Sequence, residues 1–257
     1  MRHNHDPLKE VFNRYKENYI RRGNNHFRSY SEIKTFHLDR LPRWIDRIDK
    51  TARILDAGCA TGYQLNLLRQ AGYHNLTGVD ISTELLEAAK ATLPSEIALH
   101  QAEVSDFLAK TPDKSYDVIL FHHVIEHIPR DQIIGLLREF RRCLDDNGYL
   151  SIKTPNAACL MGGCYGFGDI THLVHFNELS LLQVLELAGF AIEDIEFILH
   201  PPKLFWSWRT PLRSLMRLLN RLRWHINNLF HSVICKMIDL RPAVKVAELE
   251  LEVLAKK

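Results

Sequence analysis

The chain has 257 residues, a formal net charge of +2, 46% hydrophobic residues and 25% charged residues. These values are typical of a folded globular protein and exclude an intrinsically disordered one, and the length suits one domain with an appendage. No run approaches the roughly 18 apolar residues that a membrane-spanning helix requires. Because the first residues form no apolar signal segment, we expect the five cysteines to be free thiols in a cytoplasmic protein.

Residues 1–50 are polar and aromatic, and their helical spacing is interrupted by Pro42. We predict that they form an N-terminal helical cap over a ligand site. The alternative is a helix that packs on the edge of the sheet.

Residues 51–200 alternate short apolar runs with helical patterns, as a parallel doubly wound sheet requires. Strands are expected near 52–57, 75–80, 97–101, 116–121 and 149–154, with a turn at Asn147-Gly148 before the fifth. Helices are expected near 62–71, 83–91, 104–110 and 130–144. A sixth strand over 193–199 and a last strand over 246–255, within the segment 243–257, complete a seven-stranded, mostly parallel α/β sheet.

A loop of small residues, Asp56 to Gly62, follows the first predicted strand and precedes a helix. A dinucleotide site needs G-x-G-x-x-G, but Ala60 and Tyr63 occupy the second and third glycine positions. Asp56 would repel a pyrophosphate, whereas it would attract a ligand that carries an ammonium group. The loop therefore favours S-adenosylmethionine over NAD.

A second acidic residue, Asp80, ends the next predicted strand, 22 residues after Gly58. A carboxylate at this distance can accept hydrogen bonds from both hydroxyls of a ribose, because an ionised carboxylate is an acceptor only. This position supports the assignment of a nucleoside-containing cofactor.

Asp56, Gly58 and Gly62 resemble the D-x-G-x-G-x-G signature of the class I S-adenosylmethionine-dependent methyltransferases, from which Ala60 departs. Glu103 stands where that family usually has an acidic residue facing the adenine amino group. The resemblance also implies that the last strand lies antiparallel beside the sixth. It implies a cofactor site that contains Asp56, Gly58, Cys59, Ala60, Gly62, Asp80, Ile81, Glu103, Val104 and His122.

A histidine-rich stretch follows the fourth predicted strand and contains His122, His123, Glu126 and His127. It resembles the fourth motif of the ubiquinone-biosynthesis O-methyltransferases and of their relatives that act on sugars and lipids. His172, His175 and Ala-Gly-Phe at 188–190 extend this resemblance, which covers about 53–190.

Methyl transfer to a hydroxyl group benefits from a general base, and imidazole is well matched to neutral pH. We favour His127 or His175 as this base, with His123 and Glu126 as further catalytic candidates. The alternative is that these histidines only shape the turn.

The spacing His123-x-x-Glu126-His127, with a later histidine, also looks like the metal cluster of the small-RNA 2′-O-methyltransferases. His123 replaces the first glutamate of that cluster, which would shift the preference from magnesium towards zinc. We predict that no metal is bound, and the metal alternative stays open.

Residues 201–242 are predicted to form a basic amphipathic insertion, with eight Lys or Arg residues and one acid between 201 and 241. Apolar residues recur at helical spacing from Leu212 to Met237, while Arg213, Arg217 and Arg221 fall off that face. The segment 205–238 is therefore predicted to contact the inner face of a membrane as a surface helix. A lid or a dimer face is the alternative, and a nucleic-acid partner is not expected.

Together these features predict an S-adenosylmethionine-dependent methyltransferase that acts on a sugar hydroxyl of a glycan or lipid-linked saccharide precursor. One alternative is a quinone or another lipophilic small molecule as the acceptor. The other is a catalytically silent methyltransferase-like binding domain, because Ala60 departs from the cofactor-loop signature.

Overall fold

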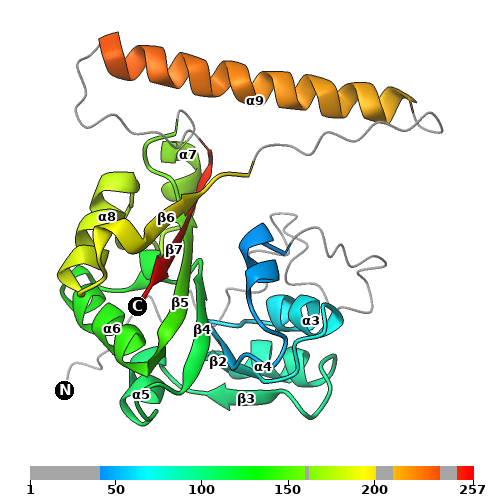
Figure 1. Cartoon of the computed structure of the whole chain (residues 1–257), viewed down its shortest axis with the longest axis vertical. Coiled ribbons are helices and arrows are strands. Elements are labelled where there is room, and N and C mark those ends of the chain that lie inside the picture. Colours follow the sequence, from blue (N-terminus) through cyan, green and yellow to red (C-terminus); the bar gives the residue numbers. More distant parts are fainter. Residues whose placement is uncertain (1–40, 160–161, 201–210, 238–247) are drawn as a thin grey trace, which may run out of the picture.

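A computed structural model describes residues 41–159, 162–200, 211–237 and 248–257 of the chain (Figure 1). Most of the predicted N-terminal cap and both ends of the predicted basic insertion lie outside the described residues. Residues 41–50 contain the short 3₁₀ helix η4 (Arg43–Arg47).

Seven strands form one sheet in the order β3-β2-β1-β4-β5-β7-β6. The parallel strands are β1 (Ile54–Ala57), β2 (Leu76–Asp80), β3 (Ala98–Gln101), β4 (Tyr116–His122) and β5 (Leu144–Pro155). The last strand, β7 (Glu250–Lys256), lies antiparallel between β5 and β6 (Ile195–Ile198). The predicted seven-stranded, mostly parallel sheet with an antiparallel last strand is confirmed.

Helices cover both faces of the sheet (Figure 1). One face packs against α5 (Val104–Ala109), α6 (Arg130–Cys143) and α8 (Glu178–Leu187), and the other against η4, α3 (Tyr63–Gln70) and α4 (Thr83–Lys90). The remaining described helices are η5 (Ile125–His127), α7 (Gly162–Gly166), η6 (Ile192–Asp194) and α9 (Pro211–Met237).

The central strand β4 shows why this sheet has to be covered on both faces. Ile119 and Phe121 belong to one hydrophobic cluster and Val118 and Leu120 to the other, and all four are completely buried. Successive side chains of a strand point to opposite faces, so a continuous apolar run buries both.

The start of β5 differs from the prediction. The strand begins at Leu144, which pairs with Tyr116, but the register then shifts so that Val118 pairs with Tyr149. Asn147 and Gly148 lie inside this irregularity and not in a turn between two elements. The polar run before Tyr149 resembles a turn in sequence. In the structure these residues are extra residues of β5 that have no pairing partner on β4, as in a β-bulge.

The helix predicted from Leu212 onwards is confirmed as α9. None of the helices in the described ranges is both long enough and apolar enough to cross a bilayer.

Candidate active site

The loop from β1 to α3 has three residues in the left-handed backbone region: Gly58 (φ 86°), Ala60 (φ 46°) and Gly62 (φ 72°). A Cβ atom at Gly58 would overlap the side chain of Val124, and one at Gly62 would overlap Leu93. Both glycines are therefore required by space as well as by backbone conformation. Ala60 adopts the same backbone region with a methyl group present.

Asp80 closes this loop onto the end of β2. Its Oδ2 accepts a hydrogen bond from the backbone nitrogen of Ala60 (2.8 Å), and its Oδ1 accepts one from Ser82 (2.9 Å). A carboxylate offers about four acceptor positions, so acceptor capacity remains on Asp80 for ribose hydroxyls. The geometry suits the role that the sequence predicts for Asp80.

Asp56, Asp80 and His122 share one face at the carboxyl edge of the sheet. Asp56 on β1 pairs with Gly78 on β2 and with Leu120 on β4. Asp80 lies two residues after Gly78, and His122 lies two residues after Leu120. Residues two apart on a strand point to the same face. Burial, reinforced by the nearby Asp80, raises the pKa of Asp56 to about 7. A cationic ligand would reverse this effect and favour the ionised form.

The remaining predicted cofactor residues border the same edge. Ile81 follows Asp80 with an exposed side chain, and exposed Glu103 precedes Val104 at the start of α5. Val104 itself is buried in the core. Cys59 is also buried, and burial raises the pKa of its thiol, so a nucleophilic thiolate is disfavoured there.

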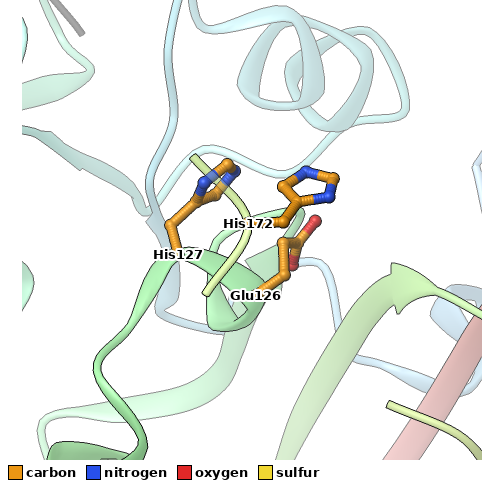
Figure 2. Close-up of side chains that lie close together, drawn as sticks. All are labelled: Glu126, His127 and His172. Carbon is orange, nitrogen blue, oxygen red and sulfur yellow. The ribbon is translucent and has the colours of Figure 1, made fainter. Parts of the chain in front are cut away.

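The turn after β4 brings Glu126 and His127 to His172 (Figure 2). One ligand-type atom from each of these three side chains lies within 4.8 Å of the others. The backbone carbonyl of Glu126 accepts hydrogen bonds from Leu173 and Val174, which fix the His172 segment beside the turn. These three residues are called the Glu-His cluster below.

His127 is oriented by two groups of Thr171. Its Nδ1 lies 3.1 Å from the carbonyl oxygen of Thr171 and 3.0 Å from its Oγ1. The Thr171 hydroxyl donates to Oδ1 of Asp169 at 2.7 Å, so it accepts from the ring of His127. Nδ1 of His127 therefore carries the proton, and the lone pair of the neutral ring lies on Nε2.

Charges around the cluster favour a neutral His127 and an ionised Glu126. Burial lowers the pKa of His127 and is only partly opposed by Glu126. Burial raises the pKa of Glu126, but the hydrogen bond and charge of His123 outweigh burial and lower it overall. Burial likewise lowers the pKa of His123, but Glu126 and Glu250 outweigh it and raise the pKa.

His175, the other favoured base, lies beside the cluster. Its ring centroid is 6.3 Å from that of His172 and 4.1 Å from that of Phe167. Burial, followed by the charge of His172, lowers its pKa. Sequence patterns predict no role for Thr171 or Asp169, because no spacing rule identifies the partner of a histidine Nδ1.

A second polar cluster lies under η4. The carboxylate of Glu252, which is 1% exposed, accepts a hydrogen bond from Nε1 of Trp44 (2.8 Å) and lies 3.1 Å from Nζ of Lys153. His200 pairs with the same carboxylate. His122 lies nearby with its Nε2 2.9 Å from Oγ of Ser151. No pattern in the sequence indicates this cluster, because its members come from five distant segments.

The sheet order, the glycine-containing loop after β1 and the acidic residues at the ends of β1 and β2 define the class of S-adenosylmethionine-dependent methyltransferases. A family model described as "Methyltransferase domain" matches residues 25–195. The chain belongs to this methyltransferase family, whose cofactor is S-adenosylmethionine.

The chain is 28% identical over 147 residues to a Mycolicibacterium smegmatis protein described as a probable S-adenosylmethionine-dependent methyltransferase. The match covers 57% of this chain and 55% of that relative, so the chain spans about half of its length. It is also 33% identical over 103 residues to an uncharacterized protein of Methanocaldococcus jannaschii, covering 40% and 37% of the two chains.

Two solved structures illustrate the shared fold. A methyltransferase from Archaeoglobus fulgidus superimposes with a TM-score of 0.61 and 21% identity, covering 86% of this chain and 92% of that one. A Burkholderia thailandensis 1,6-didemethyltoxoflavin N1-methyltransferase with bound S-adenosylhomocysteine gives a TM-score of 0.53 and 14% identity, covering 97% and 89%.

Proposed function

We propose that the chain transfers a methyl group from S-adenosylmethionine to a hydroxyl group of its acceptor. The observation that carries this proposal is the orientation of His127, whose Nδ1 is held by Thr171 within the Glu-His cluster. The turn that contains His127 touches the cofactor loop, because Val124 packs directly on Gly58. A base is therefore provided next to the predicted position of the methyl donor.

The bound cofactor supplies an electrophilic methyl group on a sulfonium, and the carbon–sulfur bond breaks as the carbon–oxygen bond forms. Nε2 of His127 accepts the proton of the acceptor hydroxyl. The ionised carboxylate of Glu126 lies beside the imidazolium that results and stabilises its charge. Thr171 and Asp169 hold the ring in the required tautomer.

The acceptor that we propose is a sugar hydroxyl of a glycan or lipid-linked saccharide precursor. This choice is supported by the resemblance of residues 122–129 to enzymes that act on sugars and lipids. A quinone or another lipophilic small molecule is the second acceptor class, because the same resemblance includes the ubiquinone-biosynthesis enzymes.

The catalytically silent alternative depends on a relaxed cofactor loop at Ala60. Ala60 keeps the left-handed backbone of a glycine, and its backbone nitrogen is bound to Asp80. This geometry supports a loop that is competent to bind the cofactor.

Calorimetric titration with S-adenosylmethionine and S-adenosylhomocysteine tests the proposal. We expect binding by the purified chain and a loss of about tenfold or more in Asp80→Ala, because two ribose hydrogen bonds to a charged group disappear. Glu87→Ala is the matched control, since it removes an exposed carboxylate from α4 and should leave the affinity unchanged. No heat of binding for either ligand would refute the proposal.

A further inference from the structure

Helix α9 turns a polar side towards the body of the protein. Nε1 of Trp224 donates a hydrogen bond to Oε1 of Glu248 at 3.1 Å, and Nε2 of His231 lies 3.3 Å from the carbonyl oxygen of Ala158. His231 is buried by this contact. Figure 1 shows α9 apart from the helices that cover the sheet.

The apolar side of α9 faces away from the body. With 3.6 residues per turn, Leu222, Ile226, Leu229 and Val233 fall on the side opposite Trp224. The apolar side chains that are between 44% and 79% exposed are Leu212, Leu215, Met216, Leu218, Leu219, Leu222, Ile226, Leu229, Phe230, Val233 and Met237. A continuous exposed apolar surface of this length indicates a binding surface.

Charge identifies the partner of this surface. The sequence of α9 contains four arginines and one lysine but no Asp or Glu. Exposed Arg223 and Lys236 border the apolar side on its two edges. Two copies of this helix would bring like charges together, whereas an anionic lipid surface attracts them and accepts the apolar side chains.

We propose that α9 lies in the plane of an anionic membrane surface, with its apolar side in the boundary between headgroups and acyl chains. Its 27 residues extend about 40 Å along the surface. Trp224 and His231 face the protein, so the contacts of α9 with the body are kept when the opposite side enters the lipid.

This arrangement brings the membrane to the active-site edge of the sheet. Ala158 follows the carboxyl end of β5, and Glu248 precedes β7, which begins at the same edge. Asp56, Asp80 and the Glu-His cluster lie at or beyond the carboxyl ends of their strands. An acceptor held in the lipid surface would therefore lie on the side of the protein that carries the cofactor loop.

Co-sedimentation of the full chain with vesicles tests the proposal. We expect binding to phosphatidylcholine vesicles that contain phosphatidylglycerol, weaker binding at high salt, and little binding to pure phosphatidylcholine. Ile226→Asp should lower the partition coefficient about tenfold, because an exposed apolar side chain is replaced by a charge within the apolar side. Asn220→Asp adds the same charge to an exposed position on another side of α9 and should retain most of the binding.

Circular dichroism and cofactor titration establish that both variants remain folded. Equal loss of binding in Ile226→Asp and Asn220→Asp would refute the assigned side, and equal binding to neutral vesicles would refute the role of charge. No binding to anionic vesicles at low salt would overturn the proposal. A dimer of the unsubstituted chain in light scattering that is absent in Ile226→Asp would also overturn the proposal. It would show that the apolar side of α9 binds a second copy of the chain instead.

Discussion

The backbone nitrogen of Ala60 donates a hydrogen bond to Oδ2 of Asp80 at 2.8 Å, which joins the loop after β1 to the end of β2. Ala60 makes this bond from a left-handed backbone conformation, with φ 46°. The substitution of alanine for the usual glycine therefore leaves the loop backbone in place and adds strain from the methyl group.

Ala60→Gly should stabilise the protein by about 1 kcal/mol, because glycine adopts a positive φ without the clash of a Cβ atom. Urea unfolding monitored by circular dichroism measures the change. Ala91→Gly is the matched control, because exposed Ala91 caps the C-terminus of α4 with φ −70°. This substitution should lower the stability of the protein. A destabilised Ala60→Gly variant would show that the methyl group contributes packing that outweighs the strain.

His127→Gln should lower kcat by about a hundredfold or more, since the proposed base is removed, and should leave cofactor affinity unchanged. His74→Gln changes an exposed residue before β2, so it is the control and should retain full turnover.

The pH dependence of activity gives a second test of His127. Only neutral His127 accepts a proton, and burial lowers its pKa below 6.5. Activity in the unsubstituted enzyme should therefore persist as the pH falls through 6.5 and decline only at lower pH. A decline centred above 6.5 would contradict this assignment.

Thr171→Val removes the hydroxyl between His127 and Asp169 and should lower kcat about three- to tenfold, with little change in KM for the cofactor. The loss is limited because the carbonyl oxygen of Thr171 still accepts from Nδ1. Thr171→Ser keeps the hydroxyl and should restore the rate. A structural role of the methyl group alone predicts the opposite, because valine keeps that methyl group and would retain the rate, whereas serine lacks it and would fail.

The core strands and the cofactor loop were predictable because each is encoded by neighbouring residues. Asp56, Gly58 and Asp80 follow apolar runs whose length and order fix the edge at which they meet. The Thr171 contact and the environment of Glu252 were not predictable, since they join residues distant in sequence through side-chain packing. The start of β5 is not predictable either, because the polar residues of its irregular ladder resemble a turn in sequence.

Chelation should leave turnover unchanged, although the Glu-His cluster has ligand atoms within 4.8 Å of one another. The proposed mechanism uses the Nε2 lone pair of His127 for the proton, and a bound cation would occupy it. The test is dialysis against EDTA, after which turnover is assayed and the metal content is measured by elemental analysis. Activity lost on chelation and restored by zinc would instead assign a metal to the cluster.

Glu252→Gln should destabilise the protein by about 2 kcal/mol at neutral pH, because Lys153 and His200 would face a neutral amide in place of a buried carboxylate. Burial raises the pKa of Glu252, but His200, Lys153, His122 and Trp44 outweigh burial and lower it to about 2. A carboxyl whose pKa is lower in the folded state than in the unfolded state stabilises the fold above its unfolded value of about 4.5. This contribution is lost as the pH falls towards 2.

Unfolding measured at several pH values tests both parts of this prediction. The difference between the unsubstituted protein and Glu252→Gln should be present above about pH 5 and should shrink below it, as Glu252 becomes protonated. Glu196→Gln is the control, because Glu196 and Arg47 form an exposed pair and its loss should cost less than about 1 kcal/mol. Equal small effects of the two substitutions would contradict the prediction and show that the charges around Glu252 contribute little net stability.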